Sequence, residues 1–411
     1  MSNLEELIEK LCHDGVEYKT LTELFDTKNG YTPSKSREEY WTNGTVPWFR
    51  MEDIRENGNI LSKAIQYVSE SAIKGSLFPA DSIIVATSAT IGQHALIKVP
   101  SLANQRFTYL VLKDEFKEQI DIMFIYYCCF KLDEYCKECL NQGNFASVDM
   151  KKFLKFKFPV PPLEVQREIV RILDNFTFLT TELAAELAAR QKQYEYYKEY
   201  LFENHIFDVE WKRLDELFPF IRNGFVGTIK SFFTNEIDGI RYLEGTNIHD
   251  GVISDNEVLY VTKEFHEKHI KNQLKADDIL MVQSGHIGEC AVVGKKYEGA
   301  NCHALIIMSN GGKCLSKYYV YYFHTLKGFK SLTPAITGGT IKHVLAGKVG
   351  KIKVPVPSLE QQQRIVDILD RFDALCNDIS DGLPAEIEAR QKQYEYYRDK
   401  LLTFKELKKE A

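Results

Sequence analysis

The sequence predicts a mixed α/β (α+β) protein built from two related modules, each followed by a long helix, with the two helices paired in an antiparallel coiled coil. Three observations predict this architecture. The chain has 411 residues, too many for one ordinary core. Its second half repeats blocks of the first half. Apolar residues recur at spacings of three, four and seven after each module. A composition of 44% hydrophobic and 27% charged residues is typical of a folded chain.

The helical segments carry the most similar part of the repeat. Ala188–Tyr197 returns as Glu388–Tyr397 with only the first residue changed. Upstream, PVPPLE at Pro159–Glu164 returns as PVPSLE at Pro355–Glu360. The regions before these blocks align only weakly. The helices therefore behave as shared architecture, whereas the modules are free to differ.

These boundaries divide the chain into five parts. Two antiparallel helices of similar sequence would relate the two modules by a pseudo-two-fold axis. We expect the N-terminal segment Leu4–Leu11 to pack near the C-terminal helix. The parts are an N-terminal helical segment (1–15), a first module (16–160), a central helix (161–203), a second module (204–356) and a C-terminal helix (357–411).

Short β-branched and apolar runs between Gly-, Asn- and Asp-rich turns predict the strands of both modules. Alternating residues predict a final strand that leads into each helix. The predicted strands are Ser82–Thr87, Thr108–Leu112 and Lys155–Phe158 in the first module, and Ile279–Val282, Leu305–Met308 and Lys351–Val354 in the second.

Each helix carries one apolar seam among Glu, Gln, Arg and Lys residues. Prolines mark both helix starts, and the first helix should run from about Leu163 to Leu201. Gly382 and Pro384 predict a break in the second helix, with helix resuming at Pro384. The predicted seams are Ile169, Leu173, Phe176, Leu179, Leu183, Leu187, Tyr194, Tyr197 and Leu201, and Ile365, Leu369, Phe372, Leu375, Ile379, Leu383, Ile387, Tyr394, Tyr397 and Leu401.

Charge and cysteine content limit the class of protein. The net charge of −6 argues against a nucleic-acid binder held by a general positive field, but it allows local basic patches. The longest apolar run, Asp121–Phe130, is too short to span a membrane. Nine scattered cysteines and a start without a signal peptide predict a cytoplasmic protein with no membrane partner.

Cys136 and Cys139 form a C-x-x-C, which is either a zinc or redox site or two thiols on a helix surface.

No catalytic motif is complete. His266 and His269 have the wrong spacing for a metalloprotease motif and fit a surface helix. His286 next to Ser284 suggests a nucleophile and base, but the matching residue of the first copy is Thr90, which cannot act as the base. The sequence therefore predicts a non-catalytic protein without a metal site.

These features together resemble the DNA-specificity subunit of type I restriction-modification enzymes. The resemblance covers nearly the whole chain, in the order typical of that family. It is carried by GYTPS at Gly30–Ser34, Tyr40, Trp41, Gly44, VPW at Val46–Trp48, SATIG at Ser88–Gly92, VPPLEVQREIVRILD at Val160–Asp174, VPSLEQQQRIVDILD at Val356–Asp370, the two ELAA tetrads at Glu182–Ala189 and both ARQKQYEYY blocks.

The resemblance implies two target-recognition domains, each reading one part of a split, asymmetric sequence in double-stranded DNA. It implies that the helices dock two modification (methyltransferase) subunits, and that restriction (translocase and nuclease) subunits join the assembly. S-adenosylmethionine, ATP and magnesium would then be bound by those partners, leaving this chain without a cofactor. The tetrads resemble the family branch in which their number sets the spacer between half-sites. The second module has Gly224–Thr228 (GFVGT) in place of GYTPS, a departure in its DNA-facing loop.

Aligned position and residue type select the candidate DNA contacts. Arginine and lysine suit guanine, Asn and Gln suit adenine, and Lys, Ser and Thr suit phosphates. The other reading of each candidate is a solvated loop or a turn-forming side chain. The candidates are Ser34, Lys35, Arg50, Ser88, Thr90, Gln105 and Arg106 in the first domain, and Arg222, Asn247, Ser284, His286, His303, Lys342 and His343 in the second.

A second hypothesis comes from another class of protein. The coiled coil would serve as a scaffold, and the modules would bind peptides or RNA. The acidic net charge favours this hypothesis, whereas the aligned loops and family motifs oppose it.

Overall fold

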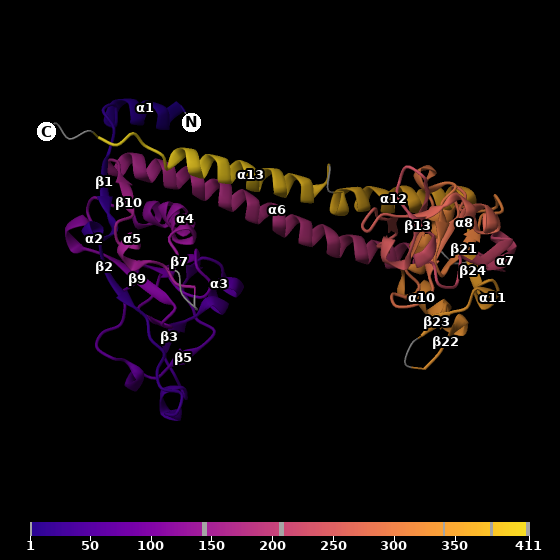
Figure 1. The fold of residues 1–411 in the computed structure, drawn as a ribbon, viewed down its shortest axis with the longest axis horizontal. Coiled ribbons are helices and arrows are strands. Elements are labelled where there is room, and N and C mark those ends of the chain that lie inside the picture. Colours follow the sequence, from indigo (N-terminus) through magenta and orange to yellow (C-terminus); the bar gives the residue numbers. More distant parts are fainter. Residues whose placement is uncertain (1, 142–145, 205–208, 340–341, 379–380, 408–411) are drawn as a thin grey trace. The chain divides into compact units, whose positions relative to one another are not determined.

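The computed structural model describes residues 2–141, 146–204, 209–339, 342–378 and 381–407. It divides into two compact units (Figure 1). Unit 1 comprises Met1–Glu182 and Ile387–Ala411, and unit 2 comprises Leu183–Glu386. Each unit therefore contains one module and part of both helical segments. The five-part division predicted above cuts the chain at different points and stays a prediction.

Unit 1 contains a mixed α/β domain. Its strands are β1 (Glu17–Thr20), β2 (Phe25–Asn29), β3 (Val46–Phe49), β4 (Ile60–Leu61), β5 (Tyr67–Val68), β6 (Ser82–Ala86), β7 (His94–Ile97), β8 (Leu102–Ala103), β9 (Phe107–Leu112) and β10 (Lys157–Val160). Its helices are α1 (Ser2–Leu11), α2 (Leu21–Leu24), α3 (Met51–Asn57), α4 (Ile122–Glu138) and α5 (Met150–Phe153), with the first part of α6 (Leu163–Asn204) and most of α13 (Leu383–Leu401).

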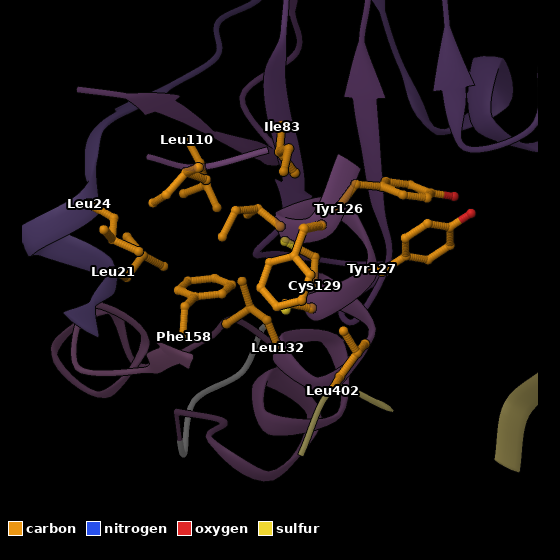
Figure 2. Close-up of a cluster of buried hydrophobic side chains, with 14 of the residues drawn as sticks. Leu21, Leu24, Ile83, Leu110, Tyr126, Tyr127, Cys129, Leu132, Phe158 and Leu402 are labelled. Carbon is orange, nitrogen blue, oxygen red and sulfur yellow. The ribbon is translucent and has the colours of Figure 1, made fainter. Parts of the chain in front are cut away.

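The core of unit 1 lies where α4 packs on its main sheet. That sheet has the strand order β2-β9-β6-β7-β4, and the antiparallel pairing of β6 with β9 places Ile83 opposite Leu110. Figure 2 shows Leu110 from β9 and Leu132 from α4 within this core, together with Leu402 from the end of the chain. A smaller sheet, β5-β3-β8, forms a second core around Phe49.

Unit 2 contains a second mixed α/β domain. Its strands are β11 (Glu210–Arg213), β12 (Phe220–Asn223), β13 (Phe233–Thr234), β14 (Gly239–Leu243), β15 (Ile248–His249), β16 (Val252–Ile253), β17 (Leu259–Thr262), β18 (Ile279–Val282), β19 (Cys290–Val292), β20 (Asn301–Cys302), β21 (Leu305–Ser309), β22 (Ile336–Thr337), β23 (His343–Val344) and β24 (Lys353–Val356). Its helices are α7 (Leu214–Leu217), α8 (Lys263–Lys268), α9 (Ser316–Phe323), α10 (Leu326–Ser331), α11 (Ala346–Val349) and α12 (Leu359–Asn377), with the rest of α6.

The two domains share one strand order. In unit 1 the main sheet contains β2-β9-β6-β7, and in unit 2 it is β12-β21-β18-β19. A parallel pair joins β3 to β8 in unit 1, and another joins β14 to β20 in unit 2. The predicted strands at 82–87, 108–112, 279–282 and 305–308 are confirmed within one residue at each end.

The last strand of each module lies two residues later than predicted. β10 starts at Lys157 and β24 at Lys353, rather than at residues 155 and 351. The reason is a turn in front of β10, where the Phe156 amide donates to the carbonyl of Phe153 at 3.1 Å. The turn in front of β24 repeats this bond, from Ile352 to Val349, at 3.1 Å. Amides held in a turn cannot join a strand ladder.

The predicted pair of long helices is confirmed. In unit 1 the ring of Phe176 on α6 stacks on Tyr397 of α13, with centroids 5.6 Å apart. In unit 2 the ring of Tyr197 on α6 stacks on Phe372 of α12, also at 5.6 Å. The early part of α6 thus contacts the late part of the second helical segment, and the late part of α6 contacts the early part. This order of contacts is antiparallel.

The seam of the helices differs from the predicted one at two positions. Leu179 is 47% exposed and Leu375 is 38% exposed, so neither is a seam residue. Thr180 is partly buried instead, and it keeps the alternation of three- and four-residue steps between Phe176 and Leu183. Predicted seam residue Ile379 lies outside the described residues. The predicted break is confirmed, because α12 ends at Asn377 and α13 begins at Leu383, one residue before Pro384.

A buried glutamine joins each domain to its helix. Gln166 on α6 accepts a hydrogen bond from the amide of Asp121 (2.9 Å) and donates to the carbonyl of Pro161 (2.7 Å). In unit 2, Gln362 accepts from the amide of Leu315 (2.9 Å) and donates to the carbonyl of Pro357 (2.9 Å). Both glutamines are fully buried. The sequence repeat is therefore also a repeat of individual contacts.

The chain ends meet in unit 1. The amide of Val16 donates to the carbonyl of Lys405, and the amide of Leu407 donates to the carbonyl of Val16, both at 2.9 Å. Leu4 of α1 belongs to the same buried cluster as Leu402, which confirms the predicted packing of the N-terminal segment (Figure 1).

The cysteines are core residues. Cys136 on α4 and Cys139 directly after it are 0% and 7% exposed, so the interpretation as surface thiols is wrong. Burial raises the pKa of the Cys136 thiol to about 12. Among the described residues, no three or more His, Cys, Asp or Glu side chains gather as a metal site would require. No helix in the described part of the chain has the length and hydrophobicity needed to cross a membrane.

Candidate nucleic-acid interface

A hollow of about 720 Å³ opens on unit 1 at the end of β3. Four of the predicted DNA contacts line it, and they are Lys35, Arg50, Gln105 and Arg106. Sequence reasoning did not select the other nine residues of its wall as contacts. They are Thr32, Ser36, Glu38, Trp41, Trp48, Met51, Glu52, Gln66 and Asn104. Four separate segments of the chain meet here, at 32–41, 48–52, 66 and 104–106, so spacing in the sequence could not indicate the grouping.

Arg50 is positioned by its neighbours on both sides. Its backbone amide donates to the buried carboxylate of Asp53 at 2.7 Å. Its guanidinium lies over the ring of Trp48, 5.6 Å from the centroid, a distance typical of a cation–π contact. The Trp48 indole in turn donates to the carbonyl of Tyr31 at 2.9 Å. The planar guanidinium is therefore held at the wall of the hollow.

Gln105 and Arg106 lie in the turn that leads into β9. The Gln105 amide oxygen accepts from the hydroxyl of Thr32. Asn104 fixes the turn because its side chain accepts from the Arg106 amide at 3.0 Å. The Arg106 carbonyl accepts from the amide of Thr87 at 3.0 Å, so this turn adjoins the loop after β6.

The other predicted residues of the first domain do not line this hollow. The Ser34 hydroxyl bonds to that of Ser36 at 2.8 Å, within a loop at its rim. Ser88 pairs with Ser147 in an isolated antiparallel bridge, and Thr90 donates its amide to the carbonyl of Ser88 at 2.9 Å. Both lie in the loop after β6, and both are partly buried.

A second hollow, of about 350 Å³, opens on unit 2. Predicted residues Ser284, His286 and His303 line it. His303 is positioned by Tyr242, whose hydroxyl lies 3.2 Å from the His303 ring nitrogen Nδ1. Sequence reasoning missed Glu244, Thr246 and His249, which line the same hollow.

Lys342 and His343 lie beside this hollow. His343 on β23 forms an antiparallel bridge with Ser284, and the next amide, of Val344, donates to the carbonyl of Gln283 at 2.9 Å. Lys342 and His343 are both exposed.

Two predicted contacts of the second domain are occupied by internal bonds. Arg222 on β12 donates to the carbonyls of Lys271 (3.0 Å) and Gln273 (3.1 Å) and to the hydroxyl of Ser309 (2.8 Å). Asn247 is 1% exposed, and its amide holds the following loop. Both side chains therefore stabilise the fold of the second domain.

The two hollows are built on equivalent backbone. In unit 1 the amides of Gly30 and Tyr31 donate to the carbonyls of Phe107 and Ala103, at 2.9 and 2.8 Å. In unit 2 the amides of Gly224 and Phe225 donate to Leu305 and Cys302, at 2.8 and 2.9 Å. A Cβ atom on Gly30 would lie 2.3 Å from the Asn104 carbonyl oxygen, and one on Gly224 would lie 2.5 Å from that of Cys302. The departure from the GYTPS pattern in the second module therefore leaves this backbone arrangement unchanged.

The loops after β6 and β18 are also equivalent. Each has two residues in the left-handed region, Ala89 (φ 63°) and Gly92 (φ 78°) in unit 1, and Gly285 (φ 79°) and Gly288 (φ 87°) in unit 2. At the first of these positions, directly before Thr90 or His286, an alanine is strained and a glycine is not.

A protein with two copies of one fold, each presenting a hollow with a different lining, belongs to the class of bipartite recognition proteins. A family model for the type I restriction modification DNA specificity domain matches residues 13–190 and 207–389. The EcoprrI specificity subunit of Escherichia coli is 38% identical over 409 residues, which cover 93% of each chain. The EcoR124I/EcoR124II specificity subunit of the same species is 34% identical over 281 residues, covering 64% of this chain and 68% of that one.

Solved structures show the same fold. The HsdS subunit from Thermoanaerobacter tengcongensis aligns with a TM-score of 0.57 at 16% identity, covering 94% of this chain and 96% of that chain. A chain from a study of assembly and conformational transition of the type I R-M system aligns with a TM-score of 0.66 at 17% identity, covering 94% and 97%. The chain described here belongs to the type I restriction-modification DNA specificity family. Members of this family select the DNA target and are themselves non-catalytic.

Proposed function

We propose that each domain reads one half of a split target in double-stranded DNA, and that the two halves differ. The observation that carries this proposal is the pair of hollows, which lie on equivalent backbone but have different linings. Three basic residues line the first hollow together with two glutamates, whereas one glutamate and three histidines line the second. The charged residues of the first hollow are Lys35, Arg50, Arg106, Glu38 and Glu52, and Glu244 is that of the second. Bases are distinguished by their donor and acceptor patterns in the major groove, so unlike linings suit unlike half-sites.

The helices would dock two modification subunits and set the distance between the half-sites. Tyr196 on α6 and Tyr396 on α13 support the docking, because they occupy equivalent positions and are 63% and 62% exposed. Two equivalent surfaces suit two copies of one partner. The ELAA tetrads at Glu182–Ala189 are the element that would tune the spacer, because four residues add about 6 Å of helix.

Restriction subunits would join this assembly, and the partner subunits would bind S-adenosylmethionine, ATP and magnesium. We place the complex in the cytoplasm. All nine cysteines are free and buried in the structure, as suits a reducing compartment.

Reconstitution tests this function. The purified chain alone should neither methylate nor cleave DNA. With its modification subunits, it should direct methylation to one bipartite sequence. Binding of that sequence should weaken steeply as salt rises, because phosphate contacts release counterions. Methylation by the chain alone, or binding of peptide or RNA in preference to duplex DNA, would contradict the proposal and favour an enzyme or a scaffold.

A further inference from the structure

One position of the shared backbone carries opposite charges in the two domains. In unit 1 the residue after β3 is Arg50, and in unit 2 the residue after β14 is Glu244. β3 and β14 are equivalent because each pairs in parallel with a short strand that precedes the turn into the main sheet. The backbone amide of Arg50 donates to the Asp53 side chain at 2.7 Å, and that of Glu244 donates to the Asn247 side chain at 2.9 Å.

We propose that Arg50 and Glu244 are a matched pair of specificity-determining residues. Arg50 donates to the O6 and N7 atoms of a guanine in one half-site. Glu244 accepts from the exocyclic amino group of a cytosine in the other. This inference rests on the proposed function, and it assigns a base to one residue in each domain.

The geometry of Arg50 suits a base better than a phosphate. Its Nε atom is buried and has no hydrogen-bond partner among the described residues. The nearest carboxylate, on Glu52, lies 4.0 Å from that atom. The contact with Trp48 holds the guanidinium at the wall of the hollow, while the side chain is still 28% exposed. A planar donor fork held in place in this way matches the two acceptors on the guanine edge.

The chemistry of Glu244 excludes a phosphate partner. An ionised carboxylate only accepts hydrogen bonds and repels phosphate. Glu244 is partly buried and lines the hollow with Thr246 and His303. In a hollow that faces DNA, the donor that such a group can meet on a base is an exocyclic amino group. Glutamate pairs with the N4 amino group of cytosine.

The experiment compares the target motifs of variant complexes. The full chain is purified with its modification subunits, and methylated adenines are mapped on genomic DNA. The same complexes are titrated with duplexes that carry each base in turn at every position of the motif. The variants are Arg50→Ala, Arg50→Lys, Glu244→Ala and Glu244→Gln. The matched controls are Arg55→Ala on α3 and Glu264→Gln on α8, both exposed and outside the two hollows.

We expect Arg50→Ala to lose preference for guanine at one position of one half-site, by about 5- to 100-fold. Arg50→Lys should recover part of this preference. Glu244→Ala and Glu244→Gln should relax one cytosine in the other half-site by a similar factor. The controls should keep the wild-type motif, and the melting temperatures should show that every variant is folded.

Two results would overturn the inference. One is uniform weakening on all sequences, which would make Arg50 a phosphate contact. The other is an unchanged motif in the Arg50 and Glu244 variants when the wild-type complex has a bipartite motif. A wild-type complex without any motif is a different result, because it would overturn the proposed function itself.

Discussion

At the scale of single residues, the two domains reuse the same structural contacts and differ at the exposed ones. Tyr127 donates its hydroxyl to Asp174 at 2.6 Å in unit 1, and Tyr321 donates to Asp370 at 2.6 Å in unit 2. At the wall of the hollows, by contrast, Arg50 stands where the other domain has Glu244. Contacts that hold the domain to its helix are thus shared, whereas side chains available to a ligand have diverged.

The buried thiols give a prediction that depends on pH. Burial raises the pKa of Cys302 from its usual value of 9.0 to about 12. The neutral thiol therefore stabilises the fold fully below pH 9, and this contribution is lost as the pH rises towards 12.

At pH 8, a disulfide reagent that reports free thiols should label the native protein slowly, and all nine thiols rapidly after denaturation. Rapid labelling of Cys136 or Cys139 in the native protein would contradict their place in the core and support a redox role.

Several residues that the sequence selected as DNA contacts lie together in the structure. Lys35, Arg50, Gln105 and Arg106 meet in one hollow, and Ser284, His286 and His303 in another. Glu244 was not selected from the sequence because an acidic residue does not by itself suggest DNA binding. Only the structure shows that it occupies the position equivalent to Arg50 of the first domain. Whether any of these residues contacts DNA stays a prediction.

At the scale of elements, the contact between each domain and its long helix can be tested by single substitutions. Gln166 satisfies one backbone amide and two carbonyls, and Gln362 satisfies one amide and one carbonyl, where each domain meets a long helix. A buried polar group without a partner costs about 1–3 kcal/mol. The same arrangement occurs in both units, so the same substitution can be made in each.

We therefore expect Gln166→Ala and Gln362→Ala each to lower the free energy of unfolding by about 1–3 kcal/mol. Chemical denaturation followed by circular dichroism measures this change. Gln363→Ala is the control, because Gln363 is exposed on α12 and its side chain donates to Asp367, one turn further along the same helix. A loss no larger than that of the control would show that these glutamines do not hold the domains to the helices.

Element types could be predicted because hydrophobic periodicity is a local signal. The strands at Ile279–Val282 and Leu305–Ser309 are buried runs between turn residues, and the helices follow a seam. The predicted seam was wrong at Leu179, because Thr180, the next residue along the helix, occupies the partly buried position. Periodicity counts apolar residues and cannot show that a polar residue fills a seam position.

At the scale of the whole molecule, the internal repeat is what made the architecture predictable. The internal sequence repeat predicted two domains and two paired helices. The strand order that the two domains share confirms the repeat. The backbone hydrogen bonds of Val16 with Lys405 and Leu407 could not be predicted from the repeat. Such bonds join main-chain atoms, so they do not depend on the type of side chain.

The exchange of one module tests the central claim, that the two domains read DNA independently, most directly. Residues 16–157 would be replaced by the corresponding module of a relative with a different target, leaving the helices and the second domain intact. Methylated adenines would then be mapped in cells that carry the modification subunits. The account predicts a new sequence in one half of the target, with the other half unchanged. A change in both halves would contradict it.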